Sequence, residues 1–460
     1  MTPTDALFWF AEGALPAFRP IIAGLYVLDR APEPGAARAS LERALARVER
    51  LRQCVVDAPA GVGLPEWRED PHFDIAYHVR QLMLPPPGGQ RELLDLAAVL
   101  LATPLDRQRP LWEAYWIGGL EEGRAAYFLK LHHSVVDGVG SIALLDAQTD
   151  PVGTRGAPPR RSRRTRPPPL PGLVGRSAAL LGDQAEWLAR IAWRIAGTPL
   201  TVARHPRRSA DAAWRTARGI RGMVGDLVQP RIADPLAVAG SGLSRRLDVA
   251  EWPLDRLQRI KTPLEITLND LVLASLAGAL GAYHRERRVH ADELACLVPM
   301  NLRGRSEREA LGNRVGMFRI ALPVGIRDPH QRLARIRAQT QAAKADRRGA
   351  AAPLFVEALA FVPAPAMRWI ARRALGRVNV ACTNVPGVAE PREMAGARIE
   401  SIFPFASVVE GTPLVMALLS YAGRMEIGID TDPEAIPDPH RITALFEAAL
   451  AEYEGLATGA

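Results

Sequence analysis

The chain has 460 residues, of which 48% are hydrophobic and 23% are charged, with a net charge of +8. This composition excludes a disordered chain and allows two sizeable folded domains. Three scattered cysteines argue against a disulfide framework and favour a reducing compartment. The positive charge favours an anionic partner, such as a membrane surface, acyl-CoA or nucleic acid, without choosing among them.

No segment of the sequence is typical of membrane insertion or export. The first ten residues lack a basic stretch ahead of an apolar core, so we expect no signal peptide. The longest apolar run, residues 271–283, is much shorter than the roughly 20 residues that a spanning helix needs. We therefore expect a soluble or peripheral protein.

Residues 1–150 alternate helical and strand-like patterns. Apolar residues at helical spacing predict an amphipathic helix over residues 37–53 and a second helix over residues 92–101. Residues 113–117 and 124–131 are typical of two neighbouring strands. The first part of the chain is therefore predicted to be a mixed α/β domain.

The second of these strands leads directly into His132-His133-Ser-Val-Val-Asp137-Gly138. If the pleat continues, the two histidines point to opposite faces, so only one needs to face a reaction site. A histidine at a strand end, with Asp137 four residues later, can act as a general base at neutral pH. Packing is the common alternative for a single histidine. Metal binding is disfavoured because no further His, Cys or Glu cluster completes a ligand shell.

Residues 151–234 form the clearest boundary in the chain and separate two predicted domains. Residues 151–171 contain six arginines among prolines, which predicts an extended linker or an electrostatic tether to anionic lipid. Residues 176–228 place tryptophans among arginines at helical spacing, as in helices that lie in a lipid interface or pack on the protein. Nucleic-acid binding is disfavoured because no zinc spacing, recognition helix or RNA-binding motif accompanies the charge.

A second mixed α/β domain is predicted over residues 235–460. Asn269 and Asp270 open the apolar run 271–283, which should be a deeply buried helix. Polar residues at its start can cap the helix or face a central cavity. Strands are expected near residues 295–300, 314–324, 378–383 and 425–430, and a closing helix over residues 439–455.

The motif HHxxxDG resembles the active-site motif of the CoA-dependent acyltransferase superfamily, which includes chloramphenicol acetyltransferase, carnitine acyltransferases and peptide-synthetase condensation domains. Further motifs occur in the order found in bacterial wax ester synthase/diacylglycerol acyltransferases, and the chain resembles that family over nearly its whole length. These motifs are Pro65-Glu-Trp67, Pro104-Leu-Asp106, Pro110-Leu-Trp112, Leu268-Asn-Asp-Leu-Val-Leu273, Val298-Pro-Met-Asn-Leu-Arg303, Asn384-Val-Pro-Gly387 and Ile436-Pro-Asp438. Thr2-Pro3 replaces a common Ser-Pro, and Ala422 replaces a common asparagine.

The resemblance implies two related α/β acyltransferase-like domains with the active site at their interface. It implies transfer of a long-chain acyl group from acyl-CoA, a substrate and not a cofactor, to diacylglycerol or to a fatty alcohol. His133 would be the general base and would pass the proton to the departing CoA thiolate. Because no serine or cysteine is positioned as a nucleophile, direct attack in a ternary complex is favoured over an acyl-enzyme.

The resemblance also suggests roles for the neighbouring residues. His132 and Asp137 complete the catalytic motif, with Asp137 more often in a structural ion pair than in catalysis. Gly138 would serve the backbone conformation of the loop. Asn269 and Asp270 would polarise the thioester carbonyl or order the acceptor, or else simply begin the buried helix.

A hydrophobic acceptor implies a cytoplasmic protein that contacts the inner face of the membrane or lipid bodies. Two alternatives stay open at this point. One is a condensation-like acyltransferase that takes its acyl group from a carrier protein. The other is a non-catalytic lipid-binding homologue, because a fold does not fix a function.

Overall fold

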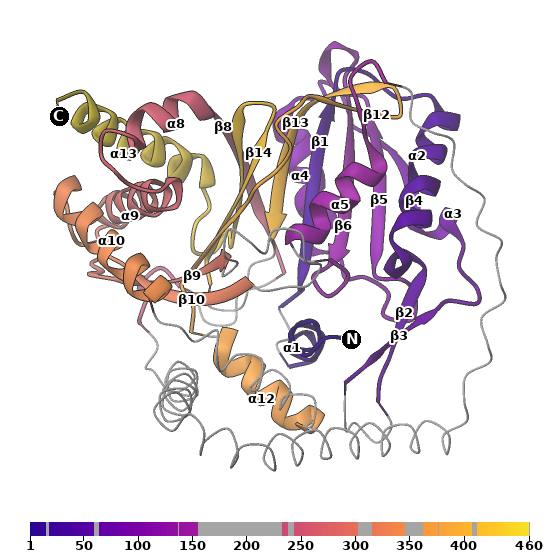
Figure 1. Cartoon of the computed structure of the whole chain (residues 1–460), viewed down its shortest axis with the longest axis horizontal. Helices are drawn as coiled ribbons and strands as arrows, with labels where there is room; N and C mark the ends of the chain where they lie inside the picture. Colours follow the sequence, from indigo (N-terminus) through magenta and orange to yellow (C-terminus); the bar gives the residue numbers. More distant parts are fainter. Residues whose placement is uncertain are drawn as a thin grey trace, which may run out of the picture.

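Two β-sheets lie side by side at the centre of the molecule, and helices cover them (Figure 1). The computed structural model describes residues 1–14, 18–58, 64–136, 138–154, 232–237, 243–301, 315–345, 362–375, 377–406 and 412–459. The predicted mixed α/β fold is confirmed. Most of the basic segment 151–234 lies outside the described residues, so its predicted tether and helices stay predictions.

The first sheet has seven strands in the order β4-β5-β6-β1-β13-β12-β7. Its strands are β1 (Ile21–Leu28), β4 (Val79–Met83), β5 (Trp112–Gly118), β6 (Ala125–His132), β7 (Asp150–Pro151), β12 (Arg392–Met394) and β13 (Ala397–Ala406). A separate hairpin joins β2 (Gln53–Val56) and β3 (Glu66–Glu69). Around them lie α1 (Pro3–Glu12), α2 (Pro34–Arg47), the 3-10 turn η1 (Glu49–Arg52), α3 (Ile75–His78), α4 (Gln90–Ala102), η3 (Glu121–Gly123) and α5 (Gly138–Gln148).

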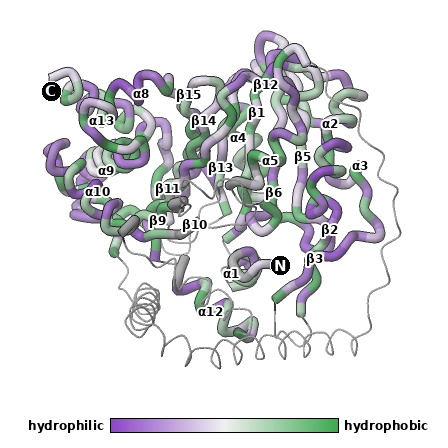
Figure 2. The backbone as a smooth tube through the Cα atoms, viewed as in Figure 1, coloured by the Kyte–Doolittle hydropathy of each residue, from purple (hydrophilic) through white to green (hydrophobic). Residues whose placement is uncertain are grey.

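The second sheet has the order β10-β9-β11-β14-β15-β8. Its strands are β8 (Arg246–Pro253), β9 (Leu294–Asn301), β10 (Val315–Leu322), β11 (Val380–Val385), β14 (Leu414–Tyr421) and β15 (Arg424–Thr431). Its helices are α8 (Leu254–Lys261), α9 (Leu268–Glu286), α10 (Pro329–Ala345), α12 (Ala364–Leu375) and α13 (Pro439–Gly459). As predicted, α9 is buried; it packs against α10 and α13, and hydrophilic residues dominate the outer helix α10 (Figure 2).

The strands predicted before the histidine motif are confirmed as β5 and β6, and the helix predicted over residues 92–101 as α4. The helix predicted over residues 37–53 ends earlier, at Arg47, where the chain turns through η1 into β2. Every residue of β6 is buried, because the strand is central in its sheet and covered on both faces. The charge of the buried Lys130 ammonium group is compensated by the Glu113 carboxylate at 2.9 Å, and the group also donates hydrogen bonds to the carbonyls of Leu100 and Thr103.

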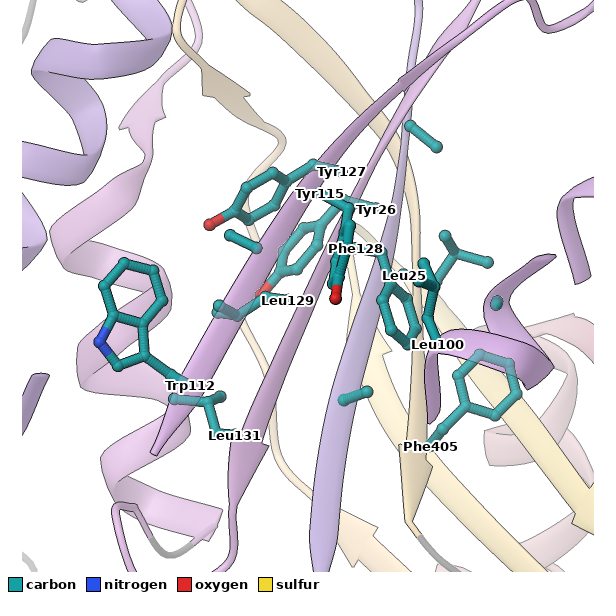
Figure 3. Close-up of a cluster of buried hydrophobic side chains, with 14 of the residues drawn as sticks. Leu25, Tyr26, Leu100, Trp112, Tyr115, Tyr127, Phe128, Leu129, Leu131 and Phe405 are labelled. Atoms are coloured by element: carbon teal, nitrogen blue, oxygen red, sulfur yellow. The ribbon is translucent and has the colours of Figure 1, made fainter. Parts of the chain in front are cut away.

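The first core includes a residue from the far end of the chain. Tyr26, Tyr127 and Phe128 lie among the strands of the first sheet, and Phe405 of β13 belongs to the same buried cluster (Figure 3). β13 pairs antiparallel with β1, from Ile22 opposite Ala406 to Leu28 opposite Ile399. Residues 392–406 lie in the predicted C-terminal unit, yet their hydrogen bonds make them part of the first sheet.

β13 also joins the two sheets, because it packs against β14 and β15. At the crossing a Cβ atom on Gly428 would lie 1.9 Å from the carbonyl oxygen of Pro404, so only glycine allows this approach. The carboxylate of Glu426 accepts a hydrogen bond from the amide of Ile402 nearby. A strand from the second half therefore fixes the two sheets to each other.

Candidate active site

β6 carries the two motif histidines to its carboxyl end, where the backbone is held on both sides. The amide of His132 donates to the carbonyl of Leu111 at 3.0 Å, and the amide of His133 donates to the carbonyl of Pro20 at 2.6 Å. Leu111 belongs to the Pro-Leu-Trp motif, and the Trp112 indole donates to the carbonyl of Leu51. Through these contacts the Pro-Leu-Trp motif packs in the structure and positions the backbone of His132.

His132 is buried, with 2% of its surface exposed. Its Nδ1 accepts a hydrogen bond from the amide of Ser134 at 3.1 Å and lies 2.7 Å from the Ser134 hydroxyl, which implies that Nε2 carries the proton. Burial, and then the nearby positive charges of His133 and Arg107, lower the pKa of His132 to about 3. His132 is therefore a neutral, inaccessible ring that shapes the turn.

His133 is only half-buried, and its ring lies against α1. The Phe8 ring stacks on it with centroids 4.0 Å apart and planes inclined by 14°. This stacking fixes the plane of the imidazole while part of the side chain stays open to solvent. The two adjacent histidines thus have the different environments that the strand pleat predicts.

One face of α1 supplies several of the groups around the motif. Side chains three or four residues apart lie on the same side of a helix. On α1 this side carries Asp5, Phe8, Trp9 and Glu12. Trp9 meets the His132 ring edge-on, with centroids 6.0 Å apart. Glu12 has an oxygen 4.0 Å from the His132 Nε2, and burial raises the pKa of its carboxyl.

Arg107 fixes Glu12 and Trp9 from the other side. Its guanidinium lies 3.1 Å from a Glu12 oxygen and 3.4 Å from the centroid of the Trp9 ring. The Trp9 indole in turn donates to Asp57 at 2.7 Å. This set of contacts anchors the carboxyl end of α1 beside His132.

Arg50 holds the turn that follows the histidines. Its Nη1 donates to the carbonyls of Ser134 at 3.1 Å and Val135 at 3.2 Å, and to Asp5 at 3.4 Å. The same guanidinium lies 5.4 Å from the ring centroid of Trp67, in the Pro-Glu-Trp motif. Arg50 therefore joins three separate segments of sequence at the candidate site.

Of the other residues predicted for the site, Asp137 lies outside the described residues, and Gly138 begins α5. Asp270 is buried, and its carboxylate accepts hydrogen bonds from the Thr267 amide and hydroxyl and from the Thr340 hydroxyl. With Thr267 it forms a capping box at the start of α9. Asn269, its neighbour, is half-buried.

Asp5, Phe8, Glu12 and Arg50 are not among the site residues predicted from the sequence. The signal for α1 was present, because Thr2 is followed by proline and Asp5, a typical helix start, and the side-chain oxygen of Thr2 accepts from the Asp5 amide. The spacing of residues 5, 8, 9 and 12 could have indicated a shared face. Nothing local could have indicated that Arg50 reaches the histidine turn. In the part of the chain that the structure describes, no group of three His, Cys, Asp or Glu residues could hold a metal ion.

Several solved structures share the fold of this chain. The wax ester synthase/diacylglycerol acyltransferase from Marinobacter aquaeolei VT8 is 24% identical, with a TM-score of 0.63, and covers 100% of this chain and 99% of its own. A starter condensation domain of rhizomide synthetase RzmA, solved with C8-CoA and Leu-SNAC, is 14% identical, with a TM-score of 0.56 over 100% of this chain and 94% of its own. These likenesses show that the chain shares the fold of these proteins.

Sequence comparison narrows the class to a family. Residues 1–272 match the wax ester synthase/diacylglycerol acyltransferase catalytic domain, and residues 311–454 match the WS/DGAT C-terminal domain. The protein tgs2 of Mycobacterium tuberculosis, named as a probable diacylglycerol O-acyltransferase, is 30% identical over 99% of this chain and 98% of its own. Another M. tuberculosis relative with the same class of name is 32% identical over 99% of both chains. The chain belongs to the wax ester synthase/diacylglycerol acyltransferase family, as its motifs indicated.

Proposed function

We propose that this protein transfers a long-chain acyl group from acyl-CoA to diacylglycerol, and also to fatty alcohols, with His133 as the general base. One observation carries the proposal. In a member of this family, the second histidine of HHxxxDG is half-open at a strand end, while its neighbour is sealed inside the protein. The names of the relatives support the same acceptor class.

The proposed reaction begins with the acceptor hydroxyl beside the His133 imidazole. As the hydroxyl oxygen attacks the thioester carbonyl, the imidazole accepts its proton and the new C–O bond forms. The C–S bond then breaks, and the imidazolium donates this proton to the departing CoA thiolate, which gives an ester and free CoA. A positioned base of this kind contributes about 10²–10⁴-fold to the rate.

Two features favour His133 over His132 as the base. His132 is buried, and its pKa is lowered to about 3, so its ring would be a weak proton acceptor out of reach of substrate. His133 is held by its backbone and by Phe8, which orients the ring before substrate arrives.

Direct transfer without an acyl-enzyme is supported by the surroundings of Ser134 and of the three cysteines. Ser134 has a hydroxyl 2.7 Å from a histidine nitrogen, but both side chains are buried. Burial raises the pKa of the Cys54, Cys296 and Cys382 thiols, which makes each a poor source of thiolate. A ternary complex of enzyme, acyl-CoA and alcohol is therefore the favoured mechanism.

We assign Asp270 a supporting role at the start of α9, because three hydrogen bonds from Thr267 and Thr340 already occupy its carboxylate. Asn269 keeps the proposed role of polarising the carbonyl or ordering the acceptor. Asp137 and Gly138 keep their proposed roles in shaping the loop after the histidines.

We further propose that the protein acts in the cytoplasm as a peripheral protein of the inner membrane face or of lipid bodies. A net charge of +8 and the arginines of residues 155–166 support attraction to anionic lipid. Neutralising those arginines should weaken sedimentation with anionic vesicles and spare turnover of a soluble alcohol. Unchanged vesicle binding would exclude the tether. Among the described residues, no helix is long and apolar enough to cross a bilayer.

The decisive experiment measures CoA release from palmitoyl-CoA with dioleoylglycerol or hexadecanol, beside a His133→Ala variant. Lipid products are identified in the same reactions. We expect acceptor-dependent release that the variant lacks, with triacylglycerol as the better product. Release only from an acyl-carrier-protein donor would favour a condensation-like enzyme, and vesicle binding without any transfer would favour a lipid-binding protein. Undiminished activity in the variant would show that the base is another group.

A further inference from the structure

The outer face of α12 combines exposed charge with an exposed aromatic ring. Arg368, Trp369, Arg372 and Arg373 are all exposed, and 58% of the Trp369 surface is accessible. Within the described part of the chain, no other tryptophan is exposed. Residues 362–375 contain no aspartate or glutamate, so nothing within the segment neutralises the arginines.

The inner face of α12 is apolar and packs on α1. Met367 and Ala371, one helical turn apart, are buried, and Ala371 forms a small cluster with Ala11 and Phe18. Figure 1 shows α12 lying against α1 below the two sheets, and Figure 2 shows hydrophilic and hydrophobic residues alternating along it. The helix is therefore attached by one side, and none of the described residues covers its basic side.

The chemistry of that basic side fits an anionic lipid surface. Arginines bind lipid phosphates, and a tryptophan ring prefers the boundary between headgroups and acyl chains. The Arg373 guanidinium lies 5.9 Å from the Trp369 ring centroid, so both can enter the same headgroup layer. A helix of 12 residues is about 18 Å long, which suits a helix lying flat on a surface.

We propose that the exposed face of α12 is the docking surface for an anionic lipid layer. This inference rests on the proposed peripheral membrane contact and assigns it to particular residues. Phe8 packs against the cluster between α1 and α12, and its ring also stacks on His133. A lipid layer bound at α12 would thus lie one helix away from the proposed base, where a lipid-dissolved acceptor is needed.

The test compares full-length variants in flotation with two kinds of vesicle, phosphatidylcholine alone and phosphatidylcholine mixed with phosphatidylglycerol. The first variant combines Arg368→Gln, Arg372→Gln and Arg373→Gln. A matched control removes the same charge from exposed arginines on α2, α8 and α10 by Arg38→Gln, Arg259→Gln and Arg335→Gln. A third variant is Trp369→Ala. Thermal melts check that each variant folds.

We expect the α12 arginine variant to bind mixed vesicles about 100-fold more weakly, because each interfacial arginine contributes about 1 kcal/mol, or about fivefold, and the variant lacks three of them. The control variant should lose much less. High salt should abolish the difference in vesicle binding between the α12 arginine variant and the wild-type protein, because salt screens charges. The weaker binding of Trp369→Ala should persist in high salt. Turnover of diacylglycerol in vesicles should fall in the α12 variants, and turnover of a water-soluble alcohol should not.

The outcomes separate this inference from the proposed function. Equal loss in the α12 and control variants, or no loss in either, would overturn docking at α12 and leave peripheral contact intact. No vesicle binding by the wild-type protein would overturn both the contact and its assignment. Absence of CoA release by the wild type would instead refute the acyl transfer, whatever the vesicle results.

Discussion

Phe8 and His133 lie ring over ring, with centroids 4.0 Å apart and planes inclined by 14°. They come from two elements far apart in the sequence, Phe8 from α1 and His133 from the end of β6. The stacking makes the N-terminal helix a wall of the site. It gives residues 3–12 a part in positioning the proposed base that the histidine motif alone does not reveal.

Phe8→Leu should therefore lower kcat by about 3–10-fold, because loss of a stacked ring pair costs about 0.5–1.5 kcal/mol. Phe10→Leu is the matched control on the same helix, because Phe10 packs against the main core. Equal effects of the two changes on rate and melting temperature would reduce Phe8 to a packing residue.

Arg50→Ala should lower kcat by about 10–100-fold, because it removes charge-assisted hydrogen bonds to the carbonyls of Ser134 and Val135. The KM for acyl-CoA should change little, because Arg50 positions the turn. Arg50→Lys should restore part of the rate. Arg38→Ala, on the exposed side of α2, is the control. A purely structural Arg50 would lower the melting temperature and leave kcat of the folded enzyme intact.

Thr267→Ala and Thr340→Ala should each destabilise the fold by about 0.5–2 kcal/mol, as losses of cap or buried hydrogen bonds do. Asp270→Asn should resemble them in urea unfolding and keep kcat near the wild-type value, because the carboxylate supports α9. The alternative role for Asp270, polarising the thioester carbonyl, requires the opposite result. In that case kcat would fall about 10²–10³-fold at unchanged stability.

Ser134→Ala should keep most of the activity, and no acyl-enzyme should accumulate in rapid-quench mass spectrometry with palmitoyl-CoA. Ser134 is buried, and its hydroxyl lies 2.7 Å from the His132 Nδ1. The variant should lose modest stability through that one contact. Covalent palmitate on wild-type Ser134, absent from the variant, would contradict direct transfer.

Glu426 should make stability depend on pH. Burial raises the pKa of its carboxyl to about 7, although the hydrogen bond from Ile402 opposes this shift. The folded state therefore binds a proton more tightly than the unfolded chain, whose carboxyl pKa is near 4.5. The free energy of unfolding should be highest below pH 4.5, the ordinary pKa of the carboxyl. It should fall by up to about 3 kcal/mol as the pH rises to about 7 and above.

Urea unfolding between about pH 5 and pH 8 tests this dependence. Glu426→Gln should flatten the pH profile, because the amide mimics the protonated carboxyl. Glu251→Gln is the control, since Glu251 is more exposed and lies 3.6 Å from the same Arg424. An unchanged slope in Glu426→Gln would show that another group titrates at the sheet junction.

The order of motifs along the chain was enough to predict the fold class and the family. HHxxxDG after an alternating strand also led to His133, because a strand end and a pleat are local properties of consecutive residues. The buried helix α9 followed from its apolar composition in the same way. In each case neighbouring residues in the sequence supply the whole signal.

Tertiary structure decided what depends on residues far apart in the chain. The pairing of β13 with β1 joins residues separated by more than 370 positions, and no local pattern specifies that partner. Likewise, Asp5, Phe8 and Arg50 reach the histidines only because α1 and η1 pack at the end of β6. The sequence determined which groups could do chemistry, and long-range packing decided which side chains hold them in place.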